Sequence, residues 1–365
     1  MNESLAFHLL NRLPGCGAKT IRFLVGVFGS AQTAWEAPQS DWAALNQPRL
    51  ATIGNSRENV DIRKEEVLLE ASQITVVPFT DSNFPKLLAE IADPPALLYI
   101  RGNYRDWNTR PHIAIVGSRK STAYGKQVAE ELSRALAKAG YTTVSGLAFG
   151  IDAIAHEATL EANGTTLAIL GSGIDDHSIS PQSHLTLAHD ILKTSGALIS
   201  ELGPGTTASV GTFPARNRIM AGLCQGTIVI EAAEDSGSLI TARLALDYNR
   251  EVFAVPGSIF SPASTGTHRL LKEGAKLVTG IQDILSELGE IQLSDDEVPK
   301  PTTPAPVLDT DEAIVYQLLS HEGIHIDKLI ALARLEAMRV NMILTKLELR
   351  GLAKNIGNLH YTRGR

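Results

Sequence analysis

Two short runs in the middle of the chain have the composition of phosphate-binding turns. Gly117-Ser118-Arg119 follows the apolar run at 113–116, and Phe213-Pro214-Ala215-Arg216-Asn217-Arg218 opens a helical pattern. Glycine lets backbone N–H groups approach an anion closely, an arginine holds a phosphate through two parallel hydrogen bonds, and a helix start has free N–H groups. These residues therefore indicate a site that binds phosphate.

The second run also carries groups that recognise a base or a sugar. Arg216 and Arg218 supply positive charge beside the helix start. Asn217 is suited to hydrogen-bond a base or a ribose, and Phe213 is suited to stack on a base. A solvated arginine pair is the alternative interpretation, and the coincidence of Phe213 with the helix start disfavours it.

Two further turns belong to the same group. Ser236-Gly237-Ser238 opens a helix, where small hydroxyl residues are also ordinary caps. The turn at 145–150 precedes a helix that carries Asp152 and His156, four residues apart on one face. A hydrogen-bonded support beneath the turn is favoured over an acid–base pair, because no nucleophile accompanies these two side chains.

The sequence lacks the usual cofactor and metal patterns. A dinucleotide fingerprint needs three spaced glycines. The window at Gly117 has one glycine, and Gly171-Ser172-Gly173 has two. The P-loop pattern GxxxxGKS/T does not occur, and His177, His184 and His189 have no helical i, i+4 spacing and no nearby cysteine. We therefore expect no dinucleotide cofactor, no P-loop nucleotide and no metal.

The elements that must position these turns alternate between strands and helices from residue 74 onwards. Repeated strand–helix units form a parallel, helix-covered sheet, in which the carboxyl ends of the strands meet at one edge. The turns then form a row of anion sites, which suits a strand of several nucleotides. We predict strands at 74–79, 113–116, 141–144, 165–170, 197–200, 227–231, 252–255 and 276–278, and helices at 151–161, within 184–193, and at 216–223, 239–248, 267–273 and 283–288.

The chain divides into four segments by composition. Residues 1–70 form a helical domain, in which the turn at 13–20 is either a helix-hairpin-helix or an ordinary connection between helices. Residues 71–289 form the sheet domain, and residues 290–310 are an acidic, proline-rich linker. Residues 311–365 show three helices and a hairpin, the winged-helix pattern.

The third helix of this tail carries Arg339, Asn341, Lys346 and Glu348 on its polar face. A winged helix that reads duplex DNA needs a basic face, whereas this face is mixed in charge. A protein–protein or regulatory role is favoured over binding in a DNA groove.

Composition limits the classes of function. The formal net charge is −7, so a nucleic-acid site must be a local pocket in an acidic body. No apolar run approaches a membrane span, and no signal peptide opens the chain. Two distant cysteines fit a reducing cytoplasm. We expect a cytoplasmic protein without a membrane partner.

Six stretches carry a resemblance to a known family. The chain resembles the DNA-processing protein A family (DprA, also called Smf), the bacterial natural-transformation proteins. The stretches are IAIVGSR at 113–119, SGLAFGIDAIAH at 145–156, GSGID at 171–175, FPARNRIMAGL at 213–223, EAAEDSGSLITA at 231–242 and VFAVPG at 252–257.

This resemblance implies an extended Rossmann-like fold with a helical domain of the SAM or helix-hairpin-helix type before it and a winged-helix-like domain after it. It implies binding and protection of incoming single-stranded DNA, loading of the recombinase RecA, homodimerisation, and no catalytic activity or cofactor. The expected DNA-binding residues are Gly117, Ser118, Arg119, Ser145, Gly146, Ala148, Gly150, Ile151, Asp152, Gly171, Gly173, Phe213, Arg216, Asn217, Arg218, Ser236, Gly237 and Ser238.

The departure from the family pattern that bears on DNA contacts lies in one loop. After GxGID the family usually shows Tyr-Pro, then Asn, often with a nearby Lys, whereas this chain has DHSISPQSH at 176–184. His177 or His184 is left to substitute weakly for the missing groups.

Two other functions compete with DNA mediation. One is a nucleoside-monophosphate phosphoribohydrolase of the LOG type, whose PGGxGT turn and following Glu are only echoed by Pro204-Gly205-Thr206-Thr207. The other is a winged-helix transcription regulator with a nucleotide-sensing core.

Overall fold

The computed structural model describes residues 1–288, 308–320 and 323–363. The chain forms two compact units, Met1–Ile291 and Gln292–Arg365. Most of the predicted linker at 290–310 lies outside the described residues, and α15 begins at Thr310. None of the described helices is long and apolar enough to cross a membrane.

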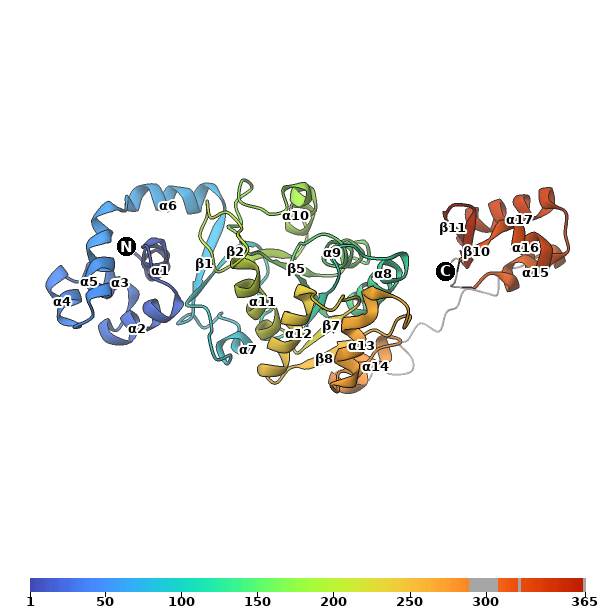
Figure 1. Cartoon of the computed structure of the whole chain (residues 1–365). Helices are drawn as coiled ribbons and strands as arrows, with labels where there is room; N and C mark the ends of the chain where they lie inside the picture. Colours follow the sequence, from blue (N-terminus) through green and yellow to red (C-terminus); the bar gives the residue numbers. More distant parts are fainter. Residues whose placement is uncertain (289–307, 321–322, 364–365) are drawn as a thin grey trace. The chain divides into compact units, whose positions relative to one another are not determined.

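The described part of the first unit is built on a nine-stranded sheet of order β1-β2-β6-β5-β4-β3-β7-β8-β9 (Figure 1). The strands from β6 to β9 in this order run parallel to their neighbours, as the alternation predicted. At one side β2 pairs antiparallel with both β6 and β1, which extends the sheet. The bounds are β1 Ile74–Pro78, β2 Leu97–Gly102, β3 His112–Val116, β4 Thr142–Ser145, β5 Thr166–Ile169, β6 Ala197–Ser200, β7 Gly226–Val229, β8 Glu251–Ala254 and β9 Lys276–Leu277.

Apolar cores cover both faces of this sheet, because side chains of a strand alternate between faces. In the buried strand β5, Leu167 and Ile169 join one core, with residues of α7, α11, α12 and α13. Ala168 joins the other, with residues of α1, α9 and α10. The helix bounds are α7 Lys86–Ala89, α8 Ala123–Lys138, α9 Ile151–Glu161, α10 Leu185–Leu192, α11 Thr212–Leu223, α12 Gly237–Asp247, α13 Thr265–Lys272 and α14 Ile281–Leu288.

Among the helices of the sheet unit, α11 differs most from its predicted start. The helical pattern placed the start of α11 at Arg216, whereas the helix begins at Thr212. Proline is tolerated in the first turn of a helix because its missing N–H has no partner there. Pro214 therefore lies inside α11, and the predicted start was four residues too late.

The N-terminal helices pack on the sheet and share one of its cores. The buried His8 of α1 contacts Tyr99 Oη of β2 through Nδ1 at 2.8 Å and Glu65 Oε2 of α6 through Nε2 at 2.9 Å. Burial lowers the pKa of His8, and the hydrogen bond with Glu65 opposes this shift. The bounds are α1 Glu3–Arg12, α2 Ala18–Phe28, α3 Ala31–Glu36, α4 Gln39–Ala44, α5 Pro48–Asn55 and α6 Ile62–Ala71.

The second unit has the predicted winged-helix arrangement. Its three strands pair in the order β10-β12-β11, and its three helices enclose a separate core that includes Val340, Ile343, Leu344 and Leu347 of the third helix. The bounds are α15 Thr310–Leu318, β10 Ile324–His325, α16 Ile326–Ala333, α17 Ala337–Leu349, β11 Ala353–Gly357 and β12 His360–Arg363.

Candidate functional site

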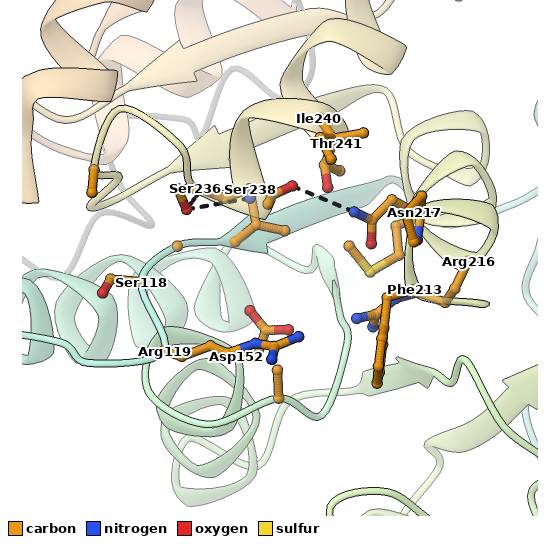
Figure 2. A pocket seen from close by; sticks show the side chains of 17 residues that line it. Ser118, Arg119, Asp152, Phe213, Arg216, Asn217, Ser236, Ser238, Ile240 and Thr241 are labelled. Carbon is orange, nitrogen blue, oxygen red and sulfur yellow. Dashed lines mark hydrogen bonds between the residues drawn. The ribbon is translucent and has the colours of Figure 1, made fainter. Parts of the chain in front are cut away.

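A cavity of about 390 Å³ opens at the carboxyl edge of β3 and β7 (Figure 2). It lies between the turn that follows β3 and the first turns of α11 and α12, so three of the predicted anion sites meet there. The expected DNA-binding residues that line it are Gly117, Ser118, Arg119, Ala148, Asp152, Phe213, Arg216, Asn217, Ser236, Gly237 and Ser238.

Arg119 and Phe213 face each other across this cavity (Figure 2). The guanidinium carbon of Arg119 is 5.3 Å from the centre of the Phe213 ring. Arg119 is exposed, and no carboxylate of the described residues forms an ion pair with it. Its charge is therefore available to an anion in solution, beside a ring that offers a stacking surface.

Arg216 has a different environment, beneath the cavity rather than in its mouth. Only 6 % of Arg216 is exposed, and its Nη1 donates to the Ile169 carbonyl at 2.7 Å. Burial lowers the pKa of Arg216, and the nearby charge of Asp152 opposes this shift. Arg216 thus supplies positive charge to the cavity floor from a fixed position.

Asp152 supports the turn that precedes its helix, as the favoured interpretation predicted. Its Oδ2 accepts a hydrogen bond from the Gly146 N–H at 3.1 Å, and burial raises its pKa. His156 hydrogen-bonds through Nδ1 to Thr166 Oγ1 at 2.6 Å, and burial lowers its pKa to about 3. Both side chains are therefore fixed by structural contacts.

The remaining predicted residues of the turn hold it against the turn that follows β3. Ser145 Oγ donates to the Ile115 carbonyl at 2.7 Å, and the Ile151 N–H donates to the Ser118 carbonyl at 3.2 Å. Gly150 has φ +75°, and a Cβ there would lie 2.3 Å from the Ser118 oxygen. Ser145, Gly150 and Ile151 shape the cavity wall from behind rather than line it.

The comparisons with known proteins agree with this architecture. Residues 75–289 match the family model described as DNA recombination-mediator protein A, and residues 299–356 match the DprA winged helix domain. The chain belongs to the DprA/Smf family. This is a family of DNA-processing proteins.

Two curated members of the DprA/Smf family illustrate the similarity. The DNA processing protein DprA of Bacillus subtilis is 38 % identical over 268 residues, which cover 70 % of this chain and 89 % of the relative. Protein Smf of Escherichia coli is 42 % identical over 261 residues, which cover 70 % and 69 %.

Solved DprA structures have the same fold. The X-ray structure of DprA from Streptococcus pneumoniae superposes with a TM-score of 0.67 at 35 % identity, covering 79 % of this chain and 98 % of that one. DprA from Helicobacter pylori, whose structure describes a single-stranded DNA binding mode, gives a TM-score of 0.53 at 33 % identity, covering 59 % and 95 %.

One expected DNA contact of this DprA-family chain is not supported by its position. Arg218 lies outside the cavity lining, unlike Arg216 and Asn217 of the same helix. Its Nη2 is 2.5 Å from Glu201 Oε2, and its Nε is 3.4 Å from Asp93 Oδ2. Two carboxylates already pair with this guanidinium, so its position gives no support to the expected phosphate contact.

Two glycines of the GSGID stretch also support the cavity indirectly. A Cβ at Gly171 would lie 3.3 Å from Cδ1 of Phe213, so the absence of a side chain at this glycine leaves room for the Phe213 ring. The Gly173 N–H donates to the Thr206 carbonyl at 2.8 Å. The segment Pro204 to Thr207, which partly resembles the phosphoribohydrolase turn, therefore contacts the GSGID loop. It does not line the cavity.

The start of α12 closes the opposite side. Ser236 caps the helix by accepting from the Ser238 N–H, and the Asn217 amide donates to the Gly237 carbonyl at 3.4 Å (Figure 2). Sequence reasoning omitted several lining residues: Val116, Pro214, Met220, Ala233, Ile240 and Thr241. Helical spacing could have predicted Met220 as a lining residue, because it lies one turn after Asn217 on the same face of α11.

The loop in which this chain departs from the family is anchored at two points. Asp176 accepts from Arg101 Nη1 and lies 3.1 Å from His189 Nε2, and these contacts hold its pKa below the usual range. At the other end, His184 Nδ1 donates to the Leu147 carbonyl at 2.9 Å. The loop therefore reaches the 145–150 turn beside the cavity.

Proposed function

We propose that this chain binds single-stranded DNA in the cavity between β3, α11 and α12 and acts as a recombination mediator. The observation that carries the proposal is the meeting of the unpaired Arg119, the Phe213 ring and two helix starts at one sheet edge. A cation beside an aromatic ring, with free helix N–H groups, binds a phosphate and an adjacent base without sequence preference. The described binding mode of the Helicobacter pylori relative supports the same ligand.

The DNA-contacting set that we propose is smaller than the sequence-based one. The proposed contacts are the residues that present groups directly to the cavity: Gly117, Ser118, Arg119, Ala148, Phe213, Asn217 and the turn from Ser236 to Ser238. Arg216 and Asp152 act from its floor. The other expected residues act by holding these groups in place.

The experiment is a binding titration of the full-length chain with fluorescent oligothymidine and with a matched duplex over a series of salt concentrations. We expect tight binding of the single strand that weakens as salt rises, because phosphate neutralisation releases counterions. Equal affinity for the duplex, or no binding, would overturn the proposal. Hydrolysis of AMP by pure protein would instead support the phosphoribohydrolase.

Membership of the DprA/Smf family supports a more specific role. We infer that the chain protects incoming single-stranded DNA during natural transformation in the cytoplasm, loads RecA onto it, and has no catalytic activity. The test is RecA-dependent strand exchange on DNA coated with a single-strand-binding protein. Addition of this chain should shorten the lag, whereas the Arg119→Ala variant should not.

We also infer a homodimer. Strand β9 is an edge of the sheet, and its Leu277 is 52 % exposed. An edge strand with an exposed leucine is a surface that a second copy can cover. Light scattering should give twice the chain mass, and Leu277→Lys should shift the protein towards the monomer.

A further inference from the structure

An aromatic pair lies beside the cavity and is not used by the function proposed above. The rings of Phe149 and His184 have centroids 4.9 Å apart and an interplanar angle of 67°. Phe149 belongs to the 145–150 turn, and His184 belongs to the loop that departs from the family pattern. We propose that this pair is a stacking platform for a second base of the bound single strand; the inference rests on the proposed function.

The position of Phe149 places the pair next to the bound strand. Its neighbour Ala148 lines the cavity. Its other neighbour, Gly150, packs so closely that a Cβ there would lie 2.8 Å from the Arg119 carbonyl oxygen. The turn that carries Phe149 therefore packs against the backbone of Arg119, which places the turn beside the proposed phosphate site.

The turn displays Phe149 at an energetic cost. The buried Leu147 has φ +56°, a left-handed conformation that a leucine rarely adopts. Two hydrogen bonds keep the turn in this conformation. The Gly146 N–H donates to Asp152, and His184 donates to the Leu147 carbonyl. Such backbone strain persists where the fold over-determines it, and it concentrates at functional sites.

The result of this conformation is an aromatic ring that faces solvent. Phe149 remains 49 % exposed although it touches His184. A lone exposed aromatic residue needs no explanation. Phe149 differs because a strained turn and a histidine from a distant loop fix its position beside an anion site. The fixed, half-exposed ring is suited to stack on a base of any kind.

The divergent loop explains why stacking would matter in this chain. Residues 176–184 contain no lysine and no arginine, so the loop offers the strand no permanent positive charge. His184 instead offers a second aromatic ring and donates its Nδ1 proton to the Leu147 carbonyl. The loop thus contributes to binding through bases rather than through phosphates.

The test separates base contacts from phosphate contacts. The full-length chain and its Phe149→Leu variant are titrated with oligothymidine and with an abasic oligomer of the same length and charge. Loss of one stack should weaken oligothymidine binding by a factor of about 5–150, the range for one base–aromatic contact. Abasic affinity and the salt slope of both oligomers should not change, because no charge is removed.

Three further variants make the result decisive. Phe149→Trp should keep the affinity, and its added fluorescence should be quenched by oligothymidine but not by the abasic oligomer. His184→Ala should weaken oligothymidine selectively, because it removes the second ring of the aromatic pair. Phe23→Leu, at a 41 % exposed phenylalanine of α2, should change nothing.

Two outcomes would overturn the stacking platform. One is unchanged oligothymidine affinity in Phe149→Leu, and the other is an equal loss for both oligomers, which would indicate a distorted turn. If the unmodified chain binds oligothymidine while either outcome is seen, only the platform fails. If the unmodified chain binds neither oligomer, the proposed function itself fails.

Discussion

The guanidinium of Arg216 occupies the space in which a side chain at position 146 would lie. A Cβ built on Gly146 would be 1.6 Å from Nη1 of Arg216. The same Nη1 donates to the Ile169 carbonyl at the end of β5. The glycine of one strand–helix turn thus provides the room for a buried charge that comes from a helix seventy positions later in the chain. This close approach joins the 145–150 turn to α11 and fixes the cavity floor.

Gly146→Ala should therefore damage the site and the fold together. The added methyl group must displace the buried Arg216 guanidinium, and overpacking of this kind costs typically 1–3 kcal/mol. Urea denaturation should show the loss of stability, and oligothymidine affinity should fall as well. Gly211→Ala is the matched control, because a Cβ at Gly211 has no atom within 4 Å. Equal stability of the two variants would contradict the role assigned to Gly146.

Arg119→Ala should weaken single-strand binding with little effect on folding. Arg119 is exposed and ends a turn, so its removal leaves no buried group without a partner. A charge-assisted contact contributes about 1.5–3 kcal/mol, which corresponds to a loss of roughly 10- to 150-fold in affinity. The log–log salt slope should become shallower by about 0.7, the value for one phosphate on a single strand. Affinity within a factor of about two of the unmodified chain would exclude the phosphate contact.

Arg218→Ala should show the reverse pattern. This guanidinium bonds to Glu201 and lies near Asp93, and its side chain is 12 % exposed. Its removal leaves the largely buried Glu201 without its partner, so unfolding free energy should fall by about 1–3 kcal/mol. Oligothymidine affinity and its salt slope, measured below the unfolding transition, should stay unchanged. A slope as shallow as that of Arg119→Ala would restore the sequence-based role of Arg218.

The contrast between Arg216, which lines the cavity, and Arg218, which does not, shows what the sequence could and could not predict. Hydrophobic alternation placed the strands and helices, and the rule that ligands bind at strand carboxyl ends placed the cavity. Helical spacing also carries the information that Arg216 and Arg218 lie on different sides of α11, 200° apart at 100° per residue. The partners do not follow from spacing: Glu201 lies near Arg218 only because the fold brings the residue after β6 to α11. The sign of φ at Leu147 also has no sequence signal, because leucine does not favour φ > 0.

The stability of the sheet unit should depend on pH through His112. Burial lowers the pKa of His112 from its ordinary value of 6.5 to about 4. The unfolded chain therefore binds a proton at this residue more readily than the folded chain does. The contribution of neutral, buried His112 to the free energy of unfolding is complete above pH 6.5. This contribution is lost as the pH falls from 6.5 towards 4, at about 1.4 kcal/mol per pH unit.

Denaturation at several pH values in this window tests the assignment. His112→Gln should reduce the slope of stability against pH by about one proton, or roughly 1.4 kcal/mol per pH unit. Parallel curves for the unmodified chain and His112→Gln would place the acid sensitivity at other groups.

The tail should not read duplex DNA through α17, although it has the winged-helix fold. A recognition helix needs free cations at the groove, whereas the cations of α17 are already paired. Arg339 Nε is 2.9 Å from Asp311 Oδ2, and Lys346 Nζ is 3.3 Å from Oε1 of the buried Glu312. The double variant Arg339→Ala/Lys346→Ala of the full-length chain should therefore keep its duplex affinity within a factor of about two. A duplex salt slope that becomes shallower by about 0.9 per removed cation would show instead that these side chains leave their carboxylates to bind DNA.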